Sequence, residues 1–167
     1  MPNWCENNLK IGHKEKSRID TIHKIVTKLL DTPSEKLKEE DGLMHSFIPR
    51  PSKEVLGDNG WYNWEIQNWG CKWDIFEQWY HEPEVVFVED KQLWGIELGF
   101  DSAWSPPVAF YETLEERGFY IYATFIEGGC DFVGRYTEGT DTTYSFDDVP
   151  KEDKELYNYV KSWRSGE

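Results

Sequence analysis

The amino-acid sequence predicts a single α+β domain in which an antiparallel sheet carries helices on one face. Several segments place apolar residues at the spacing of an amphipathic helix, and others alternate apolar and polar residues as half-buried strands do. The chain has 167 residues, of which 38% are hydrophobic and 16% aromatic. This length and apolar content suit one domain that buries its own core.

The N-terminal part predicts a strand followed by an amphipathic helix. Residues 3–11 alternate in the strand manner up to Gly12. Ser17 is a suitable cap for a helix that ends before Pro33. Residues 34–41 are charged and lack an apolar stripe, so they form either a loop or a short solvated helix. The apolar positions of the helix are Ile19, Ile22, Ile25, Val26, Leu29 and Leu30.

The middle of the chain predicts three short strands and a tryptophan-rich helix. Residues 43–48 read as a strand that ends at Pro49. The spacing of the tryptophans favours a helix from about Gly60 to Trp69 with Gly70 as its stop. Residues 71–76 form a strand or a loop. Two further strands are expected at residues 84–89 and 92–100, joined tightly at Asp90-Lys91.

The C-terminal part predicts two helices and three strands. Ser105 and Pro106 introduce a helix over 108–117 that Gly118 closes. Strands follow at 119–126, 131–136 and 142–146, and Asp148 caps a last helix over 150–163.

This order of strands and helices is the logic of a ferredoxin-like sandwich. We expect a ferredoxin-like core over about 3–136, a Trp-rich insertion, and a C-terminal extension of strands and a helix over about 137–167.

The formal net charge of −14 limits the classes of partner. Phosphate backbones and anionic membranes attract clustered Lys and Arg, so direct nucleic-acid binding and membrane binding are disfavoured. The charge fits a basic protein partner, mimicry of nucleic acid, or solubility alone. The candidate acidic surface consists of Asp141, Asp147, Asp148, Glu152 and Asp153.

Cys5, Cys71 and Cys130 are odd in number and show no metal-ligand spacing. Scattered thiols without a signal peptide or a spanning apolar run favour a reducing cytoplasm. We expect no metal and no cofactor.

A tryptophan-rich stretch from Gly60 to Asp74 holds four of the nine tryptophans, interleaved with amides and charges. Aromatic faces stack on bases or hold cations, and the amides and charges offer donors and acceptors. The structural alternative is that the rings pack on the sheet and the amides satisfy an irregular backbone. The candidate binding residues are Trp61, Trp64, Asn68, Trp69, Lys72, Trp73, Asp74 and Trp104.

No catalytic signature is present. His45 and His81 lack a metalloprotease or triad context and are expected on the surface. Glu127-Gly128-Gly129 lacks the phosphate-loop pattern. Removal of Met1 would expose the secondary amine of Pro2 as a base or nucleophile, but no partner acid accompanies it.

Four motifs together resemble one known family. The chain is similar to the YubB-like family of phage and plasmid proteins, which carry a ferredoxin-like domain. The likeness spans about Pro2 to Gly134 and implies a fold and a mobile-element origin, but no reaction. The family has Thr where this chain has Cys71, so a catalytic or metal role for that thiol is not expected. The motifs are Pro2–Asn7, Trp61–Trp64 with Asn68–Asp74, Phe100–Pro107 and Glu127–Gly134.

These observations favour a non-enzymatic acidic binding protein of a phage or mobile element, working in the cytoplasm of the bacterial host. It would inhibit or occlude a host protein with a basic surface, such as a defence or nucleic-acid-handling protein. The alternative is a small-ligand or nucleotide-binding protein, an enzyme included, with its pocket at Trp61–Asp74. Single-stranded nucleic-acid binding through sheet aromatics is a third hypothesis, which the charge disfavours.

Overall fold

The computed structural model describes residues 3–166. It is an α+β structure built on one six-stranded antiparallel sheet with the strand order β2-β3-β1-β4-β5-β6. The strands are β1 (Trp4–His13), β2 (Val85–Val88), β3 (Leu93–Ala103), β4 (Tyr120–Glu127), β5 (Phe132–Thr137) and β6 (Thr140–Ser145).

β1 lies at the centre of the sheet, because it pairs with β3 on one side and β4 on the other. Leu9 is opposite Leu98 on β3 and opposite Ala123 on β4. Alternation along β1 turns Cys5, Asn7, Leu9 and Ile11 to one face, where all four are buried. The predicted strand therefore forms, and it continues past Gly12 to His13.

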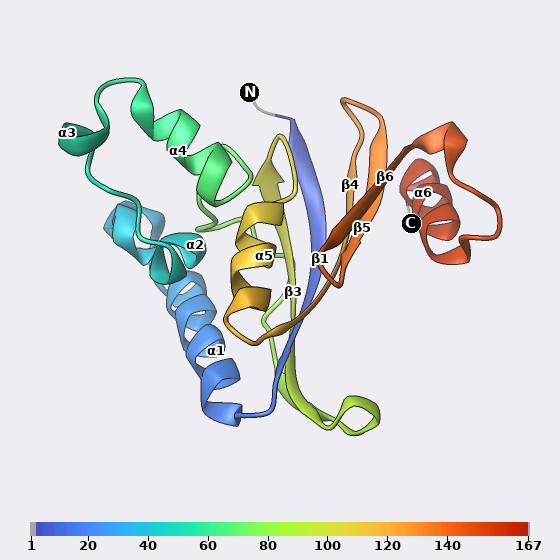
Figure 1. Ribbon diagram of the computed structural model, residues 1–167, viewed down its shortest axis with the longest axis horizontal. Helices are drawn as coiled ribbons and strands as arrows, with labels where there is room; N and C mark the ends of the chain where they lie inside the picture. The colour runs from blue at the N-terminus through green and yellow to red at the C-terminus, as the bar shows by residue number, and fades with distance from the viewer. Residues whose placement is uncertain (1–2, 167) are drawn as a thin grey trace.

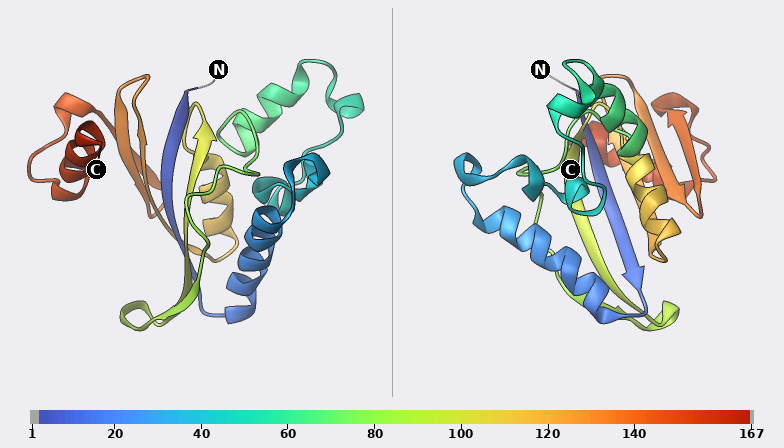
Figure 2. Two further views of the ribbon diagram at one scale, coloured as in Figure 1. Left: turned by 180° about the vertical axis from the view of Figure 1, so that it is seen from behind. Right: turned by 60° about the vertical axis from the view of Figure 1, so that its left-hand side comes forward.

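One face of the sheet is covered by helices (Figures 1 and 2). Apolar side chains of α1, α2 and α5 join the larger buried cluster with Leu9, Leu98 and Ile121 of the sheet. The helices before α6 are α1 (Lys16–Asp31), α2 (Leu43–Phe47), α3 (Lys53–Leu56), α4 (Gly60–Asn68) and α5 (Val108–Glu116). Short 3-10 turns lie at η1 (Ser34–Lys36), η2 (Glu39–Asp41), η3 (Glu89–Lys91) and η4 (Phe146–Asp148).

The last helix, α6 (Lys154–Ser165), lies on the opposite side of the sheet from α5 (Figure 1). It packs Leu156 and Val160 on Ile126 and Val133, which form a second, smaller buried cluster. Arg135 of β5 ties the start of α6 to the sheet through Asp153, at 2.7 Å, and Glu155, at 3.0 Å. The expectation that the helices cover one face of the sheet therefore holds for α1, α2 and α5 and is wrong for α6.

Three further predicted features are wrong. Residues 43–47 form the helix α2 and not a strand, because the Asp74 carboxylate accepts the N–H groups at its start. The last helix begins at Lys154, and its cap is Asp153 instead of Asp148, since Asp153 accepts from the Leu156 N–H at 3.2 Å. Ser17 lies inside α1, which begins at Lys16, and neither Ser17 nor Ser105 caps a helix with its side chain.

The Trp-rich helix is confirmed as α4, and Gly70 follows it with φ +91°. Only glycine adopts this conformation without strain. A Cβ at Gly70 would also lie 2.8 Å from the backbone N of Val108 at the start of α5. Residues 71–76 are irregular, and the chain next pairs with the edge of β3 at Trp79 and Phe100.

Candidate functional site

The structure divides the candidate binding residues into a buried group and an exposed group. In the buried group Trp69 and Asp74 are buried, and Trp64 and Asn68 are half-buried. In the exposed group Trp73 and Trp104 are exposed, and Trp61 and Lys72 are half-buried. Trp69 is buried, and its ring N–H donates to the Ile48 carbonyl at 3.1 Å. Trp64 packs edge-on against Trp69 with 5.4 Å between ring centroids. The Asn68 amide donates to the Trp64 carbonyl within the same helix, at 2.9 Å. Trp69 and Trp64 therefore hold the end of α4 on the core, whereas the Asn68 bond lies within the helix.

Asp74 belongs to the buried group and fixes a helix far away in sequence. Its carboxylate accepts from the backbone N–H groups of Met44 at 2.7 Å, His45 at 2.8 Å and Ile75 at 2.7 Å. Burial raises the pKa of Asp74 to about 6, although these N–H groups favour the charged form. The cap explains why a segment of five residues is helical.

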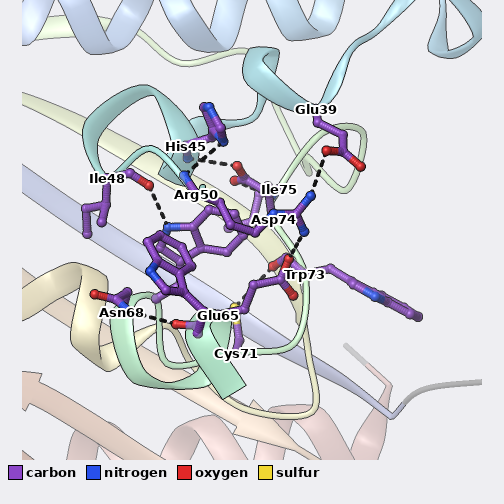
Figure 3. Close-up of polar contacts among 12 residues, drawn as sticks. Glu39, His45, Ile48, Arg50, Glu65, Asn68, Cys71, Trp73, Asp74 and Ile75 are labelled. Carbon is purple, nitrogen blue, oxygen red and sulfur yellow. Dashed lines mark hydrogen bonds and ion pairs between the residues drawn. The ribbon is translucent and has the colours of Figure 1, made fainter. Parts of the chain in front are cut away.

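A second buried carboxyl lies close to Asp74 (Figure 3). Glu65 of α4 is 2% exposed and is bound by one nitrogen of the Arg50 guanidinium. Another nitrogen of Arg50 binds Glu39 at 2.6 Å. Burial raises the pKa of Glu65 to about 7, and the Arg50 charge only partly opposes this rise. Among residues 3–166, Oε2 of Glu65 has no hydrogen-bond partner.

These groups line a pocket of about 250 Å³, which we call the Glu65 pocket. Three carboxyl groups face one guanidinium there, and indole and phenyl rings complete the walls. The lining residues are Glu39, His45, Arg50, Glu65, Trp69, Trp73, Asp74, Phe76 and Gln78.

The exposed group gathers around Lys72. The ammonium lies 4.6 Å from the ring centroid of Trp73 and 5.5 Å from that of Trp104. Trp4 lies 6.3 Å from Trp73, and the solvent-exposed fractions are 38% for Trp4, 38% for Trp73, 54% for Trp104 and 43% for Tyr62. We call these four aromatic residues with Lys72 the aromatic patch. Trp61 stands edge-on to Tyr62 beside it.

The aromatic patch borders a shallow hollow of about 500 Å³ and contains a strained residue. Trp104 has φ +74°, and its N–H donates to the Asn3 carbonyl at 2.8 Å. The left-handed region of backbone conformation costs a bulky residue about 1–2 kcal/mol. The surrounding contacts therefore hold the backbone of Trp104 in a conformation that it does not prefer. The hollow is lined by Asn59, Trp61, Tyr62, Asn63, Lys72 and Trp104.

Two of the five carboxyl groups of the candidate acidic surface are paired with arginine side chains. Asp141, Asp148 and Glu152 are exposed. Asp147 is also exposed but pairs with Arg164 at 2.8 Å. The Arg135 guanidinium binds Asp153 and lowers the pKa of that carboxyl. Asp153 is therefore a structural residue of α6.

The face of the sheet beside α6 contains a groove of about 450 Å³. Lys10 lies 5.9 Å from the ring centroid of Tyr122, and Lys91 lies 4.6 Å from that of Tyr120. Since the ammonium groups already lie over these rings, stacking of a base there would have to displace them.

The thiols and the remaining candidates are placed as follows. Cys5 and Cys71 are buried, and burial raises the pKa of both thiols, so neither is a ready nucleophile. His81 is exposed, as expected. The expectation of a surface position is wrong for His45, which is half-buried and whose ring Nδ1 accepts from the backbone N–H of Arg50 at 3.3 Å. Pro2 lies outside the described residues.

Sequence reasoning missed Arg50, Glu39 and Glu65 as a cluster and missed Trp4 and Tyr62 in the aromatic patch. The partners of Arg50 have no local spacing that could identify them. Trp4 carried a signal, since strand alternation places its side chain on the face opposite to Leu9 and Ile11.

Within residues 3–166, no cluster of three or more His, Cys, Asp or Glu side chains is arranged to hold a metal ion. The helices of this part of the chain are too short or too polar to cross a bilayer. No protein-family model, curated protein or solved structure matches the chain. The site must therefore be interpreted from its own chemistry, which comprises an exposed aromatic patch and a small pocket rich in carboxyl groups.

Proposed function

We propose that the protein is a non-enzymatic binding protein that covers part of a partner protein with its aromatic patch. The observation that carries this proposal is the exposure of Trp4, Tyr62, Trp73 and Trp104 around Lys72. Large aromatic residues dominate the energetic centres of protein interfaces, because they bury much area at little cost in side-chain entropy. Four of them together outside the core favour a surface that a partner covers.

The partner in this proposal has a basic surface. The chain carries 32 acidic residues against 18 Lys and Arg, and such an excess steers oppositely charged proteins toward it. Host proteins that handle nucleic acid, defence enzymes among them, present basic surfaces of this kind. The protein would act by occluding that surface.

The origin in a phage or plasmid and the ferredoxin-like fold are parts of the same proposal. They rest on the resemblance to the YubB-like family. The order β2-β3-β1-β4, with α1 and α5 as the two long connections, supports a ferredoxin-like core that β5, β6 and α6 extend. The bacterial cytoplasm is the compartment that goes with this origin.

The test is an affinity capture from bacterial lysate with three baits. Wild-type protein and Tyr157→Ala should retain the same basic protein, because Tyr157 is an exposed aromatic residue of α6, outside the aromatic patch. Trp104→Ala should lose it, and high salt should weaken capture by the wild type. Equal capture by all three baits, or capture of nothing basic at low salt, would refute the proposal.

A further inference from the structure

The Glu65 pocket carries more negative than positive groups. Glu39, Glu65 and Asp74 line it, and Arg50 is the one guanidinium among its lining residues. Arg50 divides its donors between Glu65 and Glu39. The oxygens of Asp74 are already engaged by three backbone N–H groups. The carboxyl groups of Glu39 and Glu65 thus share a single cation.

Glu65, which lines this pocket, has one carboxyl oxygen that lacks the partner that burial normally requires. Glu65 is 2% exposed, and its Oε2 has no donor among residues 3–166. A buried acceptor without a donor is costly, and such atoms in native proteins call for an explanation. An entering N–H donor would supply the missing bond, and a positive charge would balance the excess of carboxyl groups.

The walls of the pocket suit the same kind of ligand. Trp69, Trp73 and Phe76 provide an apolar lining beside the carboxyl groups. Aromatic rings are also compatible with cations. A volume of about 250 Å³ is below the range of roughly 300–1,000 Å³ typical of sites for drug-sized ligands. The pocket therefore fits a small ion or a single side chain.

We propose that the Glu65 pocket binds an organic cation, an ammonium or guanidinium group, through the carboxyl groups of Glu65 and Glu39. The cation is either a free small amine or guanidine, or a Lys or Arg side chain of a bound protein. Because Oε2 of Glu65 is shielded in this structure, a cation that reaches this oxygen has to displace part of the pocket lining.

The elevated pKa of Glu65, about 7, supports this assignment. A bound cation favours the ionised carboxyl, so affinity should rise as the pH increases through 7 and fall below it. The charged and titratable groups that face Glu65 from the neighbouring elements are Arg50, Glu39, Asp74 and His45.

The test is titration calorimetry of the whole protein with butylguanidinium and butylammonium chloride. N-butylurea is the control, since it has nearly the shape of butylguanidinium without the charge. We expect at least one of the two ions to bind and N-butylurea to leave the protein unaffected. Equal binding of N-butylurea, or binding of neither ion at pH 8, would overturn the proposal.

Matched variants locate the binding. Glu39→Gln and Glu65→Gln should each weaken the affinity about tenfold or more, because each removes a charge-assisted contact. The Glu39 side chain is 68% exposed, so Glu39→Gln should keep the fold. It therefore tests the site even where Glu65→Gln unfolds the protein. Glu40→Gln removes the same charge from an exposed neighbour outside the pocket and should change nothing. An equal loss in Glu40→Gln would reduce the effect to general attraction and refute the site.

A comparison of butylguanidinium with a blocked Gly-Arg-Gly peptide distinguishes the two sources of the cation, a free small molecule and a protein side chain. Tighter binding of the peptide indicates a protein side chain, and tighter binding of the free ion indicates a small molecule. Trp104→Ala should keep cation binding while losing partner capture, so this inference and the proposed function fail separately.

Discussion

At the scale of single residues, the most unusual groups are the two buried carboxyls. The pKa of Glu65 rises from 4.5 to about 7, and that of Asp74 from 3.8 to about 6, both chiefly through desolvation. Between pH 4.5 and 7 the native protein holds a proton on Glu65 that the unfolded chain has released. The free energy of unfolding therefore falls as the pH rises through this interval. Asp41 and Asp153 have lowered pKa values, so their contribution to the pH dependence of stability lies below this interval.

We predict that wild-type protein needs more urea to unfold at pH 5.5 than at pH 7.5, and that Glu65→Gln reduces this difference. The reason is that Gln does not titrate and still offers an oxygen to Arg50. Urea titrations at the two pH values measure the effect.

Glu54→Gln is the control, because Glu54 is exposed in α3 and its replacement changes the net charge equally. An unchanged pH dependence in Glu65→Gln, or the same reduction in Glu54→Gln, would show that the general charge of the protein causes the trend.

At the scale of elements, α2 depends on a residue that is distant in sequence. Asp74 accepts from the N–H groups of Met44 and His45 at its start. Asp74→Ala leaves these buried donors without an acceptor, so we expect a loss of about 2–4 kcal/mol in the free energy of unfolding. Asp148→Ala, at an exposed position of η4, should change it by about 0.5 kcal/mol or less. Chemical denaturation measures both, and similar losses would contradict the capping role.

The same scale shows what local sequence can predict. Except for the largely exposed β6, the strands of the sheet and helices α1, α4 and α5 follow from the spacing of their apolar residues, which depends only on neighbours in the chain. α2 has five residues, too few for a periodic pattern, and its cap lies 29 and 30 positions away from the N–H groups it accepts. The face that α6 covers also depends on distant partners, Arg135 on β5 and Glu155 on α6.

At the scale of the whole molecule, the two buried clusters share β4. Phe125 points into the larger cluster, and the next residue, Ile126, points into the smaller one beneath α6. A substitution that loosens the packing on one face of the sheet therefore also affects the strand on which the other cluster packs.

We expect the chain to unfold in one cooperative transition, and Leu156→Ala to lower its stability by about 2–5 kcal/mol, since Leu156 is fully buried. Asn158→Ala, on the exposed side of α6, should have little effect. Tryptophan fluorescence and far-UV circular dichroism should report the same midpoint. A separate early transition would show that α6 is an independent unit.

The sequence alone does not tell which of the candidate binding residues are buried and which are exposed. Their position in a tryptophan-rich stretch identifies them as candidates. Trp69, the residue after α4, is buried, and its ring N–H reaches the distant Ile48 carbonyl. Trp104 follows the end of β3 with a positive φ, and its ring is exposed. Trp4 joins the patch through the pairing of β1 with β3. These are tertiary relations, and no local spacing encodes them.

The central claim is that the aromatic patch is the surface that a partner covers. The most direct measurement is hydrogen–deuterium exchange of the protein with and without the captured basic partner. We predict slower exchange in residues 3–6, 59–63, 72–74 and 103–105 when the partner is bound. Slower exchange confined to residues 138–152, with the patch unchanged, would place the interface on the acidic surface and contradict the claim.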